Sequence, residues 1–141
     1  MDNTNKTAYL QMIQEPICRM STISAIFKGF VATIVAGVAS LTYTDVNVWV
    51  LGLSFLPVLA FAFLDVYYLT LERKFRFLFE QVRKDEHEVD FSIKLTNDPV
   101  EILQAKARGC DCVKSPSIYL FYPLMIAILA TVFILKLIGV I

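Results

Sequence analysis

Residues 63–84 read FLDVYYLTLERKFRFLFEQVRK, and this stretch decides the fold. Its first half is apolar except for one aspartate, Asp65, whereas its second half is rich in arginine and lysine. No glycine or proline interrupts it, so we expect one continuous helix. A helix that changes character in this way passes between two solvents. The apolar half is predicted to lie in a membrane and the basic half in water.

The composition of the whole chain also indicates a membrane protein. Hydrophobic residues make up 57% of the 141 residues, above the roughly 45–50% apolar share of soluble domains. Three segments, residues 23–43, 48–69 and 118–140, reach the length of about 20 residues that a helix needs to cross a bilayer. A soluble bundle is the alternative, but the third segment carries one charge, Lys136, and has no polar stripe. The sequence predicts an all-α membrane protein with three transmembrane helices.

The distribution of Lys and Arg predicts the orientation, because cytoplasmic flanks retain positive charge. Residues 71–116 hold nine basic residues, whereas residues 42–48 hold none. We therefore expect the N-terminus in the cytoplasm and the C-terminus outside. Residues 1–20 lack a continuous apolar run, so no cleavable signal peptide is expected.

The segments outside the membrane are expected to form a small helical cytoplasmic layer. Residues 1–22 predict an amphipathic helix interrupted at Pro16. The cytoplasmic segment, residues 70–117, first continues the helix of the second span to about Glu88. A short helix over Pro99–Arg108 then follows. One face of the continuing helix is apolar: Leu71, Phe75, Leu78, Phe79, Val82. The segments expected to cover it supply Leu10, Ile13, Ile17, Met20, Val100, Ile102 and Leu103. Such a thin layer predicts self-association, with a tetramer favoured.

The opposite face of the same helix is charged. It carries Arg73, Arg76, Glu80, Arg83, Lys84 and His87. Glu72 with Arg76, and Glu80 with Lys84, have the acid-first spacing that supports an exposed helix. In an oligomer this face would form a polyanion site, completed by Lys106, Arg108 and Lys114. Contact with anionic lipid headgroups is the alternative explanation for Arg73 and Arg76.

Two features inside the spans have functional interpretations. The first two spans are antiparallel and joined near residues 45–47, so Lys28 and Asp65 lie at one depth, and we predict an intramembrane ion pair. The alternatives are a snorkelling Lys28 and an Asp65 that meets water or a tyrosine hydroxyl. Thr33, Gly37 and Ser40 form the least apolar face and are the candidate pore-lining residues. Pro57 predicts a kink in the second span.

The sequence does not favour an enzyme, a metal site or a cofactor. The cysteines are Cys18, Cys110 and Cys112, and the C-D-C spacing is not that of a zinc knuckle. No nucleophile elbow, phosphate loop, dinucleotide fingerprint or paired-histidine motif is present.

The stretches YLQMIQEPICRMSTISAIFKGFVATIVAGVASL and FLDVYYLTLERKFRFLFEQVR, with Phe121 and Tyr122 opening the third span, resemble small three-span bacterial membrane proteins. The chain is similar to the membrane subunits of the Hailong anti-phage system. That resemblance implies a membrane-damaging effector, held inactive by single-stranded DNA oligomers that a partner nucleotidyltransferase makes.

Two functions are therefore expected. The first is an oligomeric effector of the bacterial inner membrane that permeabilises or depolarises it like a channel, under control of a nucleotide or DNA oligomer on its basic face. The alternative is a structural or adaptor membrane protein that recruits a cytoplasmic partner and has no pore activity.

Overall fold

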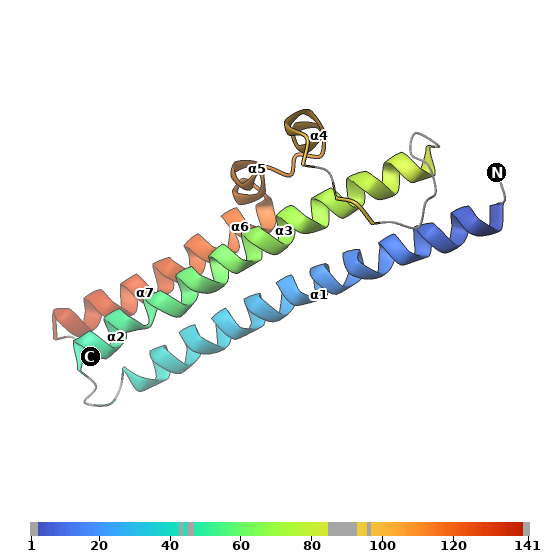
Figure 1. The fold of residues 1–141 in the computed structure, drawn as a ribbon. Helices are drawn as coiled ribbons and strands as arrows, with labels where there is room; N and C mark the ends of the chain where they lie inside the picture. Colours follow the sequence, from blue (N-terminus) through green and yellow to red (C-terminus); the bar gives the residue numbers. More distant parts are fainter. Residues whose placement is uncertain (1–2, 43, 45–46, 85–92, 96, 140–141) are drawn as a thin grey trace. The chain divides into compact units, whose positions relative to one another are not determined.

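The computed structural model describes residues 3–42, 44, 47–84, 93–95 and 97–139. These residues form helices and no strand, as predicted. In chain order the helices are α1 (Asn3–Leu41), α2 (Val48–Leu53), α3 (Phe55–Arg83), α4 (Pro99–Gln104), α5 (Gly109–Val113), α6 (Pro116–Tyr119) and α7 (Phe121–Leu137) (Figure 1).

Long apolar helices fit a membrane location. Among the described residues, two helical stretches, Thr4–Leu41 and Val48–Arg83, are long and apolar enough to span a bilayer. A third span is added if two helical stretches separated by a bend, Pro99–Tyr119 and Phe121–Leu137, are counted together as one crossing. The residues that the structure describes thus contain two to three candidate spans.

The helices contribute to two compact units. The first contains Met1–Ser24 and Val66–Val113, and the second contains Ala25–Asp65 and Lys114–Ile141. The long helices α1 and α3 each supply part of both units.

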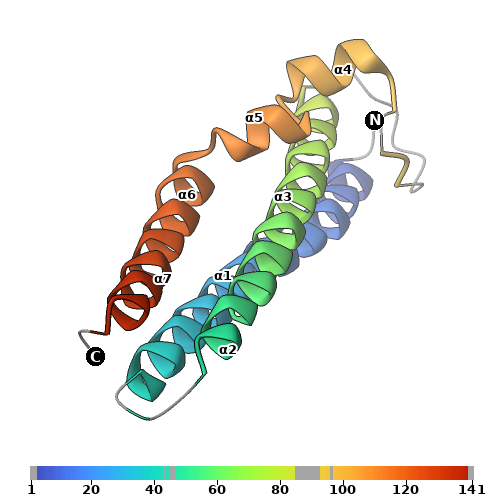
Figure 2. The same ribbon diagram turned by 90° about the vertical axis from the view of Figure 1, so that its left-hand side faces the viewer.

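The first unit has an apolar core between α1 and α3, which lie side by side (Figures 1 and 2). Its buried members are Tyr9, Ile13, Ile17, Phe75, Leu78 and Val82, with Leu10, Met20, Phe79 and Leu95 packed against them. The prediction that the N-terminal segment covers the apolar face of α3 is confirmed. Tyr9 was not predicted, although it lies one helical turn before Ile13 and is fully buried.

The predicted contribution of Val100 and Leu103 to this core is wrong. Both side chains are more than half exposed, at 62% and 52%. Leu95, from the segment before α4, packs against the core instead. Because α4 has only six residues, it offers less than two turns of apolar face.

Helix α4 also ends earlier than predicted. Asp98 caps its start as expected, accepting a hydrogen bond from the backbone N–H of Val100. At its end, Lys106 and Ala107 donate backbone hydrogen bonds to Leu103 and Ile102 at 3.1 and 3.0 Å. This is the bonding pattern of a Schellman motif, with Lys106 in the left-handed conformation at φ 50°.

Gly109 therefore does not end the predicted helix over Pro99–Arg108. It begins α5 instead. The motif two residues earlier satisfies the carbonyls at the end of α4, so the chain has already turned before Gly109 is reached.

The proline in the N-terminal helix does not interrupt it, contrary to expectation. Pro16 lies inside α1, which continues to Leu41 without a break near residue 22. Proline removes one backbone hydrogen bond. The buried Ile13 and Ile17 flank Pro16 in the core shared with α3, and this packing holds the helix on both sides of the missing bond.

The second predicted span is divided near its proline. Pro57 cannot donate a hydrogen bond to the carbonyl of Leu53, four residues earlier. Helix α2 ends at Leu53 and α3 begins at Phe55. Between them, the Ser54 hydroxyl donates to the carbonyl of Leu51 at 2.6 Å. Helix α3 ends at Arg83, and the expected end near Glu88 lies outside the described residues, as does His87.

The second unit packs parts of α1, α2, α3 and α7 through aromatic and aliphatic side chains. Phe61 lies 5.6 Å from Phe27 and 5.9 Å from Phe30 between ring centroids. At the far end of α7, the Lys136 ammonium donates to the carbonyls of Thr42 and Thr44 at 3.2 and 3.1 Å. The lone charge of the third segment thus binds carbonyls of residues that follow the end of α1.

The core of the first unit generates a stability prediction. Ile13→Ala should destabilise the protein by about 2–5 kcal/mol, because it leaves a cavity among buried side chains. Met12→Ala is the matched control, since Met12 is the neighbouring residue and 44% exposed. Unfolding in mild detergent, followed by circular dichroism, measures both. Equal effects of the two substitutions would contradict this core.

Candidate functional site

A charged cluster lies inside the second unit. The Lys28 ammonium is 2.7 Å from Asp65 Oδ2, and the Asp65 side chain is fully buried whereas that of Lys28 is 19% exposed. The structure thus contains the ion pair predicted from the depth of the two residues. It joins α1 to α3, which run in opposite directions here (Figure 1).

A third member of the cluster comes from α7. The Tyr122 hydroxyl is 3.1 Å from Asp65 Oδ2 and 3.3 Å from the carbonyl of Phe61, and it can donate its proton to either oxygen. A tyrosine hydroxyl was one of the two alternatives for Asp65. Asp65 therefore has both a lysine ammonium and a tyrosine hydroxyl as partners. Lys28, Asp65 and Tyr122, hereafter the Asp65 cluster, therefore connect three helices.

The physical reason for this arrangement is the cost of burying a charge. An ionised carboxylate in an apolar medium is tolerated when an opposite charge and hydrogen bonds compensate it. Asp65 has both kinds of compensation, from Lys28 and Tyr122. Separating the partners of such a pair would leave an uncompensated charge. Arrangements of the three helices that separate them are therefore disfavoured, and the cluster fixes which helix faces meet.

The candidate pore-lining residues are exposed on α1. Thr33, Gly37 and Ser40 all lie on the open surface of the chain. The hydroxyls of Thr33 and Ser40 donate to the carbonyls of Gly29 and Ala36, each at 2.9 Å. A side chain added at Gly37 would meet nothing within 4 Å. This small, mildly polar face is hydrogen-bonded within its own helix and open to a neighbour.

Three of the predicted ligand-binding residues come together in the first unit. The guanidinium of Arg73 donates to the carbonyl of Lys106 at 2.6 Å, so α3 and the turn after α4 are joined. Arg73, Arg76 and Lys106 line one hollow of about 290 Å3, whose other walls are Phe77, Glu80 and Ala105. The left-handed turn at Lys106 is what aims its carbonyl at Arg73.

Two of the basic side chains have acidic partners on the same helix. Arg76 is 2.7 Å from Glu72, as the spacing predicted. Glu80 pairs with Arg83 at 2.7 Å, whereas the sequence predicted Lys84. The planar guanidinium of Arg83 reaches the carboxylate across three residues, and arginine suits such pairing better than lysine. These pairs lower the net charge that the face presents.

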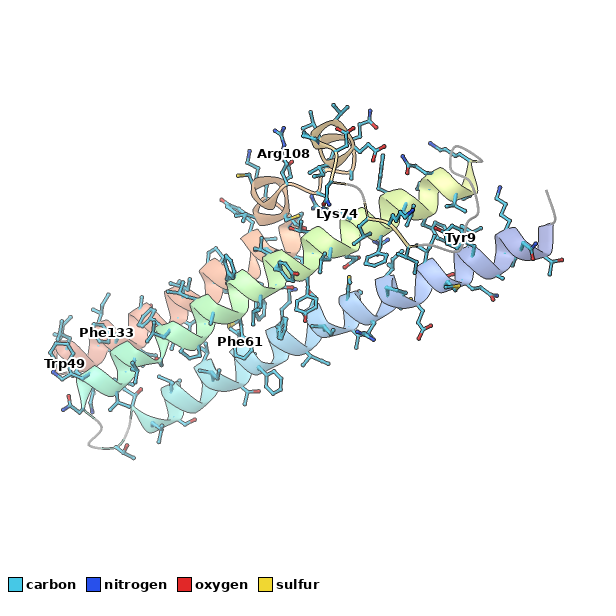
Figure 3. All side chains as sticks on the ribbon, in the orientation of Figure 1. Tyr9, Trp49, Phe61, Lys74, Arg108 and Phe133 are labelled. Atoms are coloured by element: carbon cyan, nitrogen blue, oxygen red, sulfur yellow. The ribbon has the colours of Figure 1, made fainter. Side chains whose placement is uncertain are left out.

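The other predicted ligand-binding residues are not among those that line the hollow. Lys84 is exposed at the end of α3, and Arg108 is exposed in the turn between α4 and α5 (Figure 3). Lys114 belongs to the second unit. Of the seven predicted ligand-binding residues, Arg73, Arg76 and Lys106 line this hollow, and the seven-residue site stays a prediction.

The cysteines have structural or exposed positions. Cys112 is fully buried, and its sulfur accepts a hydrogen bond from the Thr70 hydroxyl at 3.4 Å. Cys18 and Cys110 are exposed. In the part of the chain that the structure describes, no three His, Cys, Asp or Glu residues are grouped to hold a metal ion.

The Asp65 cluster generates a prediction about Tyr122. Tyr122→Phe should destabilise the protein by about 1.5–3 kcal/mol, the usual contribution of a hydrogen bond to a charged group. Tyr119→Phe is the matched control, because Tyr119 is 67% exposed. The measurement is the midpoint of thermal unfolding in detergent. A Tyr122→Phe protein as stable as the control would show that this hydroxyl does not stabilise Asp65.

Comparison of the chain with known protein families, curated proteins and solved structures finds no match.

Proposed function

We propose that the protein is a homo-oligomeric membrane effector that permeabilises the bacterial inner membrane under the control of an anionic cytoplasmic ligand. The N-terminus and the first unit face the cytoplasm, the C-terminus faces outward, and the spans of neighbouring copies assemble in the membrane. A tetramer is the favoured assembly.

One observation supports this function above the others. The face of α1 formed by Thr33, Gly37 and Ser40 is exposed on the single chain, although it lies in a segment apolar enough to span a bilayer. Small residues allow helices to approach closely, and hydroxyls are better accommodated beside protein or water than beside lipid. Neighbouring α1 helices that meet through this face would exclude lipid from it and supply polar groups to a water path.

The hollow of Arg73, Arg76 and Lys106 supports control by an anion. Its two arginines and one lysine offer hydrogen-bond donors to phosphate oxygens, and Phe77 offers an aromatic surface on which a base stacks. A single-stranded DNA oligomer or a nucleotide fits this chemistry. A nucleotidyltransferase encoded by a neighbouring gene would supply this ligand.

Permeabilisation is tested in cells. Expression of the protein should collapse the membrane potential reported by a potential-sensitive dye, and Gly37→Leu should prevent the collapse because it separates the α1 helices. Leu59→Phe is the control, since it adds volume at an apolar position of α3 that is 53% exposed. Matched expression levels are required. No collapse with the wild-type protein, or equal collapse with Gly37→Leu, would refute the proposed pore.

Ligand control is tested with purified oligomer and short single-stranded DNA at two salt concentrations. Lys84→Glu with Lys106→Glu should weaken binding and flatten its salt dependence, because fewer phosphates are neutralised. Both lysines are exposed, so the change leaves the pairs of Arg76 and Arg83 intact.

The control for this experiment is Arg19→Glu with Lys94→Glu, which changes the net charge by the same amount at other exposed positions of the first unit. Equal weakening by the two double variants would mean non-specific attraction. Absence of binding to the wild-type protein would remove the nucleic-acid ligand and leave lipid headgroups as the partners of these residues.

An adaptor is the second candidate, and the pairing of the arginines favours it. Arg73 donates to Lys106, Arg76 pairs with Glu72 and Arg83 pairs with Glu80. A layer in which these three arginines are already bonded within the chain does not need an anionic ligand to pair them. An adaptor predicts a stable membrane oligomer that leaves the membrane potential unchanged.

A further inference from the structure

A second hollow lies in the second unit, at the exposed side of Lys28. Its volume is about 470 Å3, within the range of about 300–1,000 Å3 found for small-ligand sites. The lining residues come from α1, α6 and α7: Lys28, Pro116, Ser117, Leu120, Phe121, Leu124. The hollow is distinct from the basic hollow of the first unit, and no step of the proposed function uses it.

The lining of this hollow is amphiphilic. Leu120 and Leu124 are 67% and 56% exposed, so the chain leaves apolar surface uncovered beside the break between α6 and α7. Lys28 and Ser117 add an ammonium and a hydroxyl to the same wall. A ligand that fills the hollow therefore needs an apolar body and an anionic end.

The surroundings of the hollow supply further positive charge. Lys114 is exposed and lies two residues before Pro116, which lines the hollow. Tyr119, 67% exposed, lies in the same short helix α6. Tyrosine and lysine are the residues that anchor a span at the level of the lipid headgroups. Residues of these kinds beside the hollow favour a ligand that carries both a phosphate and acyl chains.

We propose that this hollow binds an anionic phospholipid of the adjacent leaflet. One acyl chain lies against Leu120, Phe121 and Leu124, and the phosphate accepts hydrogen bonds from Lys28 and Ser117. The charge of Lys114 favours an anionic headgroup over a zwitterionic one. A bound lipid would join α1 to α6 and α7 on the exposed side of the Asp65 cluster.

The lipid site is tested by native mass spectrometry of delipidated protein titrated with phosphatidylglycerol, phosphatidylcholine, diacylglycerol and inorganic phosphate. Phosphatidylglycerol should bind most tightly. Leu124→Trp, which fills the apolar wall, should weaken its binding because the acyl chain loses its place. Ser117→Asp, which repels a phosphate, should weaken it by about tenfold or more, as expected for the loss of one charge-assisted contact. Neither substitution touches Asp65 or Tyr122.

Ile134→Trp is the matched control, because Ile134 is also on α7, is 51% exposed and does not line the hollow. Unchanged unfolding midpoints establish that each variant is folded. Binding of phosphatidylglycerol that is insensitive to both Leu124→Trp and Ser117→Asp would overturn the proposal. Equal binding of diacylglycerol would overturn it too, and displacement of the lipid by inorganic phosphate alone would point to a free anion instead. These results do not depend on whether the protein depolarises cells.

Discussion

A carboxylate with no exposed surface, Asp65, sets the main constraint on this protein. Its position in an apolar helix requires an opposite charge within reach, and Lys28 on α1 provides it. The carboxylate oxygen that binds Lys28, Asp65 Oδ2, also lies within hydrogen-bond distance of the Tyr122 hydroxyl of α7. Because one residue of each helix contributes, the cluster joins the three helices at defined positions.

Both units of the chain bury apolar side chains, but the second also contains a buried charged cluster. In the first, α1 and α3 share an ordinary apolar core, with Tyr9, Ile13 and Val82 fully or almost fully buried. In the second, many large apolar side chains are exposed, as expected of a surface that faces lipid. There, polar contacts provide the specific connections: the Asp65 cluster and the bonds from Lys136 to the end of α1.

The sequence was informative where one physical rule dominated. Antiparallel geometry placed Lys28 at the depth of Asp65, helical periodicity selected Ile13 and Ile17 to cover α3, and Asp98 was identifiable as a cap. The second partner of Asp65, Tyr122, could not be chosen in advance, since several tyrosines lie near the ends of the spans. The position of Tyr122 depends on the path of the chain through α5 and α6, for which the sequence contains no periodic signal.

The structure differs from the expectations where another contact or a local motif overrides a simple sequence rule. Pro16 was expected to interrupt a helix that packing keeps continuous. Gly109 was expected to end a helix that Lys106 had already ended in a conformation uncommon for lysine. The basic residues were grouped by charge, but their pairing with Glu72, Glu80 and a backbone carbonyl depends on side-chain reach, which the order of charges does not specify.

A double-mutant cycle on Lys28→Met and Asp65→Leu tests the central role of the buried pair most directly. The free energy of unfolding in mild detergent should fall by about 3–5 kcal/mol for each single variant, because each leaves a charge uncompensated. The double variant should lose clearly less than the sum, with a coupling of up to about 3 kcal/mol. If the losses of the two single variants instead add up to that of the double variant within about 0.3–0.5 kcal/mol, Lys28 and Asp65 act independently. That result would contradict the role of their pair in joining the helices.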